Sequence, residues 1–165
     1  MKKDLAIIFG LFLLIVVLLI FGRGFSTAGY LGLQNQTQQD KNTITLTAKS
    51  LTIEANVVTK PSDRQKGLSG LDSLSLNQGM FFVFENKGPY GFWMKDMKFA
   101  IDIIWIDEDK NIIDMAQNAA PQPGKKNKEL TIYRPRSDAL YILEVNAGLA
   151  SLHNLQIGDK VAFEL

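Results

Sequence analysis

An uninterrupted apolar segment near the N-terminus constrains this chain more than any other sequence feature. Residues Leu5 to Phe21 read LAIIFGLFLLIVVLLIF and contain no charged or strongly polar side chain. A helix rises about 1.5 Å per residue, so the segment extends roughly 25 Å, and its flanks can complete a hydrocarbon core of about 30 Å. We therefore expect residues 1–23 to form a transmembrane anchor, with residues 5–21 in contact with the membrane.

A cleaved secretory signal peptide is the alternative reading of this segment. Lys2 and Lys3 form a basic start, and Ser26-Thr27-Ala28 supplies small residues for cleavage. The apolar run is longer than the roughly 7 to 15 residues usual in a signal peptide, which favours a retained anchor. Lys2 and Lys3 outnumber Arg23 across the run and predict a cytoplasmic N-terminus. The expected location is the cell membrane, single-pass, with an extracytoplasmic C-terminal domain, or secreted if the segment is cleaved.

Composition beyond the apolar segment excludes several classes of partner and chemistry. Residues 24–42 are rich in Gly, Gln, Asn and Thr, which predicts a flexible polar linker. Beyond this N-terminal region acidic and basic residues balance, so the sequence predicts no nucleic-acid partner. Cysteine is absent, which excludes disulfides, thiolate zinc sites and a cysteine nucleophile.

Residues 43–165 have the length of one small domain, and their start alternates apolar and polar residues. Thr43 to Lys49 and Leu51 to Thr59 show this alternation with many β-branched types, which predicts two strands. Ser62, followed three positions later by Gln65, is a capping-box signature for a short helix that Gly67 would end.

The segments Ile101 to Asp107 and Asn111 to Gln117 predict a β-hairpin turning through Glu108-Asp109-Lys110. A turn centred on Asp109 and Lys110 pairs Ile104 with Met115, Trp105 with Asp114 and Ile106 with Ile113. One face then carries Asp102, Ile104, Ile106, Ile113 and Met115, and the other carries Ile101, Ile103, Trp105, Ile112 and Ala116. Because both faces are apolar, we expect a central hairpin covered on both sides.

The remaining patterns complete an α+β fold class. We expect strands at Gly79–Phe84, Leu140–Val145 and Lys160–Leu165, an exposed loop at Gln122–Glu129, and a short helix at Ala147–His153 ended by Asn154. About seven strands and two short helices make a small β-rich domain behind the N-terminal transmembrane helix. A partly closed barrel or a sandwich would protect its strand edges.

An ordered series of motifs resembles a known family. The motifs are Arg64-x-x-Gly67-Leu68, Gly79-Met80-Phe81-Phe82-Val83-Phe84, Phe92-Trp93-Met94-Lys95, Ile101-Asp102-Ile103-Ile104, Leu143-Glu144-Val145-x-Ala147-Gly148 and Gly158-Asp159. Over Leu51 to Leu165 they resemble the domain of unknown function 192 family (DUF192, also called UPF0127). The resemblance implies a small β-rich domain, often behind an export or anchor segment, and points to no particular activity or ligand. This chain departs from the family pattern at Asp96-Met97, where Asn-Thr is usual, and it lacks a cysteine pair between Gln122 and Glu129.

Charged residues within the apolar segments are the candidate functional groups. The aromatic residues of Gly88 to Asp107 are typical of a core, but Lys95 and Asp102 are not explained by apolar packing. A buried carboxylate needs a cation or hydrogen-bond donors, and Arg64 and Lys95 are the candidate partners of Asp102. Glu144 raises the same question on the face of Ile142.

These residues favour a binding or interaction module for a small polar ligand or peptide, with a pocket near the site residues. The candidate ligand-binding residues are Arg64, Trp93, Lys95, Asp102 and Glu144. An enzyme is the alternative, in which Asp102 and Glu144 act as acid and base near Lys95.

A copper-binding domain is a third hypothesis. Met94 and Met97, beside Trp93, supply the soft ligands that Cu(I) prefers, although methionine is also a routine core residue. The only histidine, His153, lies near a predicted helix end without a serine motif of the nucleophile-elbow type. The sequence predicts no cofactor.

Overall fold

A computed structural model describes residues 42–165, and these residues belong to one compact unit. The expected transmembrane segment and nearly all of the predicted linker lie outside the described residues. Among residues 42–165, no helix is both long and apolar enough to span a membrane. The elements are β1 (Thr43–Ala48), β2 (Leu51–Val58), α3 (Pro61–Lys66), β3 (Gln78–Gly88), β4 (Ile101–Ile106), β5 (Ile112–Ala119), the 3-10 turn η2 (Asn127–Glu129), β6 (Ala139–Asn146) and α4 (Leu149–Leu152).

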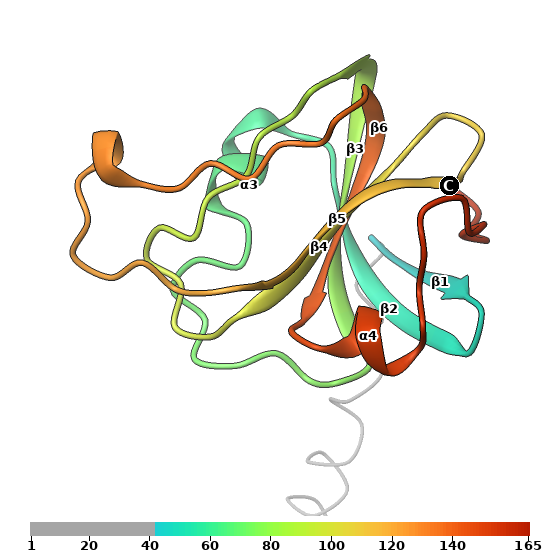
Figure 1. The fold of residues 1–165 in the computed structure, drawn as a ribbon, viewed down its shortest axis with the longest axis horizontal. Coiled ribbons are helices and arrows are strands. Elements are labelled where there is room, and N and C mark those ends of the chain that lie inside the picture. Colours follow the sequence, from blue (N-terminus) through green and yellow to red (C-terminus); the bar gives the residue numbers. More distant parts are fainter. Residues whose placement is uncertain (1–41) are drawn as a thin grey trace, which may run out of the picture. The chain divides into compact units, whose positions relative to one another are not determined.

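Six strands form a single sheet in the order β1-β2-β3-β6-β4-β5 (Figure 1). Neighbouring strands are antiparallel except β2 and β3, which are parallel and are connected through α3. The described residues therefore form six strands instead of the expected seven, and the sheet is not a closed barrel. The described domain is small and β-rich with two short helices.

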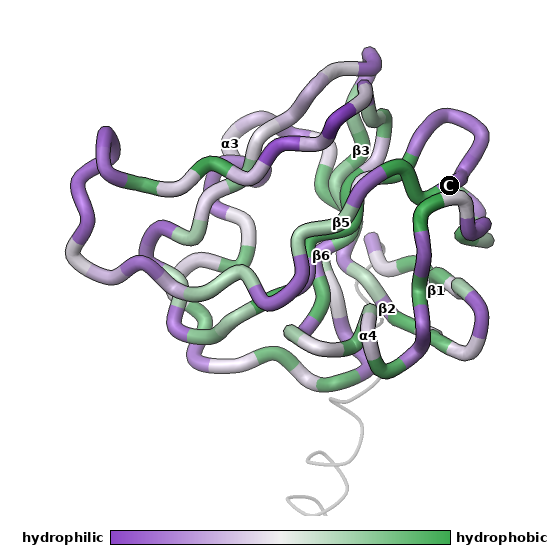
Figure 2. Tube along the Cα trace, viewed as in Figure 1, coloured by the Kyte–Doolittle hydropathy of each residue, from purple (hydrophilic) through white to green (hydrophobic). Residues whose placement is uncertain are grey.

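Apolar side chains pack on both faces of this sheet and form two separate cores. The first core contains residues of β1 and β2 together with Phe81, Ile104, Leu143, α4 and Phe163. The second core contains Phe82, Met94, Ile103, Trp105 and Ile142. Successive side chains of a strand point to opposite faces, so Ile103 and Ile104 divide between the two cores. Hydrophobic residues follow the strands through the middle of the unit, and hydrophilic residues dominate the outlying loops (Figure 2).

The predicted hairpin is present, and its register is irregular at two points, between Ile101 and Ile103 and between Trp105 and Ile106. Ile104 pairs with Met115 and Trp105 with Asp114, which confirms these two pairs. An irregularity after Trp105 pairs Ile106 with Ile112 instead of Ile113. Ile112 therefore joins the first core and Ile113 the second, opposite to the prediction, because a one-residue shift exchanges the faces.

The position of the hairpin in the sheet also differs from the expectation. Every residue of β4 is buried, so this strand is covered on both sides as predicted. β5, however, is the last strand of the sheet, and only three of its eight residues are buried. The sequence pattern could not separate these positions because both strands carry apolar residues on both faces.

Two local predictions were wrong and two were confirmed. The segment Lys160–Leu165 forms only isolated bridges, such as that of Ala162 with Thr47, because it crosses between sheet edges instead of extending one. Helix α3 begins at Pro61, and no side chain caps it, so the Ser62 capping box is absent. Proline needs no cap at the first helical position, where it has no N–H to satisfy. Gly67 ends α3 and Asn154 follows α4, as predicted, and both residues have a positive φ.

Candidate ligand-binding pocket

Glu144 lies in the middle of the sheet and is the most unusual polar residue of the domain. On β6 it pairs with Met80 of β3 and Ile103 of β4, and it faces the second core. Its exposed fraction is 5%, and its Oε2 atom has no hydrogen-bond partner among residues 42–165. Because burial disfavours the charged form, the pKa of the Glu144 carboxyl rises from its ordinary 4.5 to about 8.

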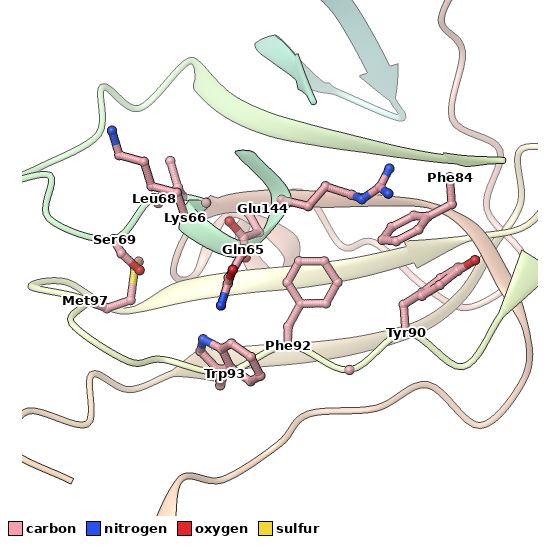
Figure 3. A pocket seen from close by; sticks show the side chains of 13 residues that line it. Gln65, Lys66, Leu68, Ser69, Phe84, Tyr90, Phe92, Trp93, Met97 and Glu144 are labelled. Carbon is pink, nitrogen blue, oxygen red and sulfur yellow. The ribbon is translucent and has the colours of Figure 1, made fainter. Parts of the chain in front are cut away.

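A cavity of about 240 Å³ opens beside this carboxyl (Figure 3). Helix α3 and the residues after it form one wall, and the segment from Tyr90 to Trp93 forms the opposite wall. Gly67 lies directly against the carboxyl, since a Cβ atom there would be 3.7 Å from Oε2 of Glu144. The lining residues are Arg64, Gln65, Lys66, Gly67, Leu68, Ser69, Phe84, Tyr90, Gly91, Phe92, Trp93, Met97 and Glu144.

Aromatic rings and one guanidinium group form a stacked end of the cavity. The Phe84 and Tyr90 rings are stacked with centroids 3.5 Å apart, and the Arg64 guanidinium lies 4.5 Å from the centroid of the Phe84 ring. Arg64 also donates hydrogen bonds to the carbonyl oxygens of Thr59 and Val83. The guanidinium is therefore held by protein groups at this end of the cavity.

The wall opposite α3 has no regular secondary structure, and contacts from distant strands hold it. Nε1 of the Trp105 indole donates a hydrogen bond of 2.9 Å to the carbonyl oxygen of Tyr90. Phe92 exchanges two backbone hydrogen bonds with Tyr133. The Phe92 ring also packs edge-on against Phe82, with centroids 4.9 Å apart. These contacts fix the aromatic residues that face the cavity.

A second cavity of about 330 Å³ adjoins the first and shares Gln65, Lys66, Ser69 and Trp93 with it. Its other lining residues are Lys95, Asp96, Asn127, Leu130 and Ile132. Trp93 is 40% exposed, which is high for a tryptophan, and it lines both cavities. Lys95 therefore lies near Trp93 but lines the cavity that Glu144 does not reach.

Asp102 is fully buried, and its partners are not the predicted ones. Its two carboxylate oxygens accept hydrogen bonds from the backbone N–H groups of Asn118, at 2.8 Å, and Ala150, at 2.9 Å. The prediction that Arg64 or Lys95 pairs with it was wrong. Backbone donors stabilise a buried carboxylate without a cation, and sequence motifs cannot show such donors.

The structure separates Asp102 from Glu144. Asp102 points to the face of the first core, as Ile104 does, while Glu144 points to the face of the second core, as Ile142 does. The sheet therefore lies between the two carboxyl groups, and an acid and base pair built from both is wrong. Among the predicted ligand-binding residues, Arg64, Trp93 and Glu144 share the first cavity, Lys95 lines the second, and Asp102 lines neither.

The methionines of the copper hypothesis are packed as core residues. Met94 is fully buried, and Met97 is buried in the same core while lining the first cavity. His153 follows α4, which packs in the other core, and its Nδ1 atom lies 2.9 Å from the Ser50 Oγ atom. That contact joins the turn between β1 and β2 to the end of α4.

Sequence reasoning missed Gly67, Phe84 and Tyr90 as pocket residues. Gly67 was expected only to end a helix, and the two aromatic residues fitted a core. Gly67 and Glu144 become neighbours only when the parallel β2-β3 connection places α3 over β6. The series Arg64-x-x-Gly67-Leu68 was the one sequence signal that pointed to this part of the pocket.

The fold and the sequence together define the family of this chain. The sequence model of DUF192, described as "Uncharacterized ACR", matches residues 43–163. The chain belongs to the DUF192 family, which confirms the resemblance carried by the sequence motifs.

Three known proteins are similar to this chain. A UPF0127 protein of Thermococcus gammatolerans is 26% identical over 93 residues, and the match covers 55% of this chain and 55% of that relative. A crystal structure of a protein of unknown function from Novosphingobium aromaticivorans has a TM-score of 0.64 and 27% identity, covering 73% of this chain and 83% of that one. A crystal structure of a protein of Sinorhizobium meliloti, described as a proposed transcription regulator, has a TM-score of 0.64 and 26% identity. This match covers 73% of this chain and 92% of that one.

Proposed function

We propose that this protein is a membrane-tethered binding module that holds a small polar ligand, or a group of a peptide, in the cavity between α3 and the Tyr90–Trp93 segment. The apolar run Leu5–Phe21 and the basic start of the chain support a tether with the domain outside the cytoplasm. Should the leading segment be cleaved, the same domain would be secreted.

One observation carries the binding proposal: Glu144 is almost completely buried and lines a cavity, and its Oε2 atom has no hydrogen-bond partner among the described residues. Nearly all buried polar groups in folded proteins have a hydrogen-bond partner, and each exception needs an explanation. A carboxyl that only stabilised the fold would have donors around it, as Asp102 has. A ligand that reaches Glu144 supplies the missing partner.

The composition of the walls fits a small-molecule site. Such sites are concave and mostly apolar, with a few polar groups that orient the ligand. Here Phe92, Trp93 and Tyr90 supply apolar surface, and Glu144 is one of a few polar groups in the lining. Lys95 in the adjoining cavity can contact the outer part of a longer ligand, whereas Asp102 is not part of the proposed site.

Binding is tested with the full chain in mild detergent and a panel of small amines, amides and carboxylates, followed by ligand-observed NMR. We expect at least one compound to bind saturably to the wild-type protein. Trp93→Ala removes a ring that borders both cavities, so it should weaken binding about tenfold.

Leu152→Ala is the matched control because Leu152 is an exposed apolar residue on α4, on the side of the other core. It should leave the affinity unchanged. The proposal fails if no compound binds, or if the two variants weaken binding equally.

A further inference from the structure

We infer that the group which meets Glu144 in the pocket is an organic cation, a primary or secondary ammonium of a small molecule or peptide, and that its binding displaces one proton from the Glu144 carboxyl. This inference rests on the proposed binding function and names the chemistry of the ligand. The displaced proton leaves to solvent, and the carboxylate and the ammonium form an ion pair.

No cation of the described protein neutralises Glu144. The strands beside it contribute the uncharged Met80 and Ile103. The other titratable groups lining the cavity are Arg64 and Lys66 from α3 and Tyr90 from the opposite wall. The Arg64 guanidinium is bonded to two carbonyl groups and lies over Phe84, and the Lys66 side chain extends away from Glu144 (Figure 3).

The aromatic walls favour a cation over other ligand groups. The face of an aromatic ring carries partial negative charge and attracts ammonium and guanidinium groups within about 6 Å. Phe92 and Trp93 line the wall of the cavity that faces Glu144 (Figure 3). Arg64 over Phe84 is such a contact within the same cavity. Rings beside a carboxyl are therefore suited to hold a charged amine.

Anionic and neutral ligands fit the pocket less well. An anion could bind only while Glu144 stays protonated, because two carboxylates held close together repel each other. A neutral amide would form hydrogen bonds with the carboxyl but would gain little from the aromatic faces. A cavity of about 240 Å³ has room for a small alkylammonium group.

Because binding displaces a proton, the affinity for the cation should change with pH in a definite direction. With a pKa of about 8, Glu144 is mostly neutral at pH 6 to 7 when the pocket is empty. An alkylammonium keeps its charge up to about pH 10, so of the two partners in the ion pair Glu144 is the one that titrates near pH 8. The cation binds the ionised carboxyl, and the association constant should rise about tenfold per pH unit below pH 8 and level off above it.

The test compares three probes that each contain a four-carbon chain: n-butylammonium, butyramide and butyrate. Their affinities for the full chain in mild detergent are measured by NMR titration at pH 6, 7, 8 and 9. We expect butylammonium to bind best, with an affinity at pH 7 about tenfold higher than at pH 6. Butyramide should bind weakly without pH dependence, and butyrate should bind most weakly at pH 9.

Two outcomes overturn the inference and leave the binding function intact. One is tighter binding of butyramide or butyrate than of butylammonium, and the other is butylammonium binding that does not change between pH 6 and 8. If no compound of the wider panel binds either, the proposed function itself fails.

Glu144→Gln tests whether this carboxyl is responsible. The amide has nearly the same shape but cannot ionise, so the variant should lose both the preference for butylammonium and the pH dependence. An unchanged pH dependence in a folded variant overturns the inference. If the variant does not fold, the carboxyl resonance of Glu144 in the wild-type protein is titrated instead, and butylammonium must lower its midpoint from near 8.

Discussion

Two buried carboxylates, Asp102 and Glu144, show how the immediate neighbours of a residue decide its chemistry. Asp102 accepts two backbone hydrogen bonds, so its charge is compensated inside the protein. Glu144 has an unpartnered oxygen and neighbours that are mostly apolar, and burial raises its pKa. The first residue is built into the fold, while the second remains available to a ligand.

Glu144 makes the stability of the empty domain fall as pH rises. Its pKa is about 8 in the folded state and near 4.5 in the unfolded chain, so the folded state binds more protons between these values. The contribution of Glu144 to the free energy of unfolding is fully present below about pH 4.5. It is lost progressively as the pH rises to about 8, by as much as about 5 kcal/mol.

Glu144→Gln should therefore abolish this loss, with little effect at pH 5 and a clear gain of stability at pH 8. Urea unfolding of both proteins at pH 5, 6, 7 and 8 gives the comparison. Parallel stability curves for the two proteins would show that Glu144 is ionised in the folded state.

At the scale of elements, Asp102 joins three parts of the fold. It lies in β4, accepts one hydrogen bond from Asn118 near the end of β5, and accepts another from Ala150 in the first turn of α4. Asn118 has a positive φ of 53°, which is unusual within a strand. The hydrogen bond from its N–H to the Asp102 carboxylate therefore stabilises an irregular point of the edge strand. A side chain in the hairpin thereby positions a helix that follows it by nearly fifty residues.

Asp102→Ala should destabilise the protein by about 3 kcal/mol, because it leaves two backbone N–H groups without their acceptor and opens a cavity. The exposed Asp72, which pairs with Lys98 on the surface, provides the control Asp72→Ala, expected to change stability by less than about 0.5 kcal/mol. Urea unfolding at pH 7 measures both. Equal small effects would mean that Asp102 does not connect these elements.

For the described unit as a whole, the C-terminal segment connects the two edges of the sheet. Near β5, the N–H of Val161 donates to Lys110, and at β1, Thr47 and Ala162 exchange hydrogen bonds. The Phe163 ring packs edge-on against Phe81, with centroids 4.8 Å apart, and against Tyr141 at 5.1 Å. The segment closes the first core without forming a strand.

Phe163→Ala should lower the free energy of unfolding by about 3 to 4 kcal/mol, since it removes a buried ring from the first core and weakens the connection between the two edges of the sheet. Leu165→Ala is the control, because Leu165 is exposed two residues later. Thermal unfolding followed by circular dichroism compares the variants. If Phe163→Ala unfolds at the wild-type temperature, the C-terminal segment does not stabilise the unit.

Much of the fold could be predicted because strand and turn patterns are local. Alternation identified β1 and β2, and the spacing around the Asp109–Lys110 turn gave the pairs Ile104–Met115 and Trp105–Asp114. The motif series identified the family. The position of β5 at the edge and the register shift beside Ile112 could not be predicted, because they depend on packing against distant segments.

The candidate site, like the fold, could be predicted only in part from the sequence. The sequence by itself determined which residues needed an explanation, because Glu144 and Asp102 are charged groups within apolar strands. Only the tertiary structure decided that Asp102 is satisfied by backbone donors and that Glu144 meets Gly67 and an aromatic wall across a cavity. The physical reason is that a chain pattern fixes the face on which a side chain lies, while its hydrogen-bond partners come from whichever distant segment packs against that face.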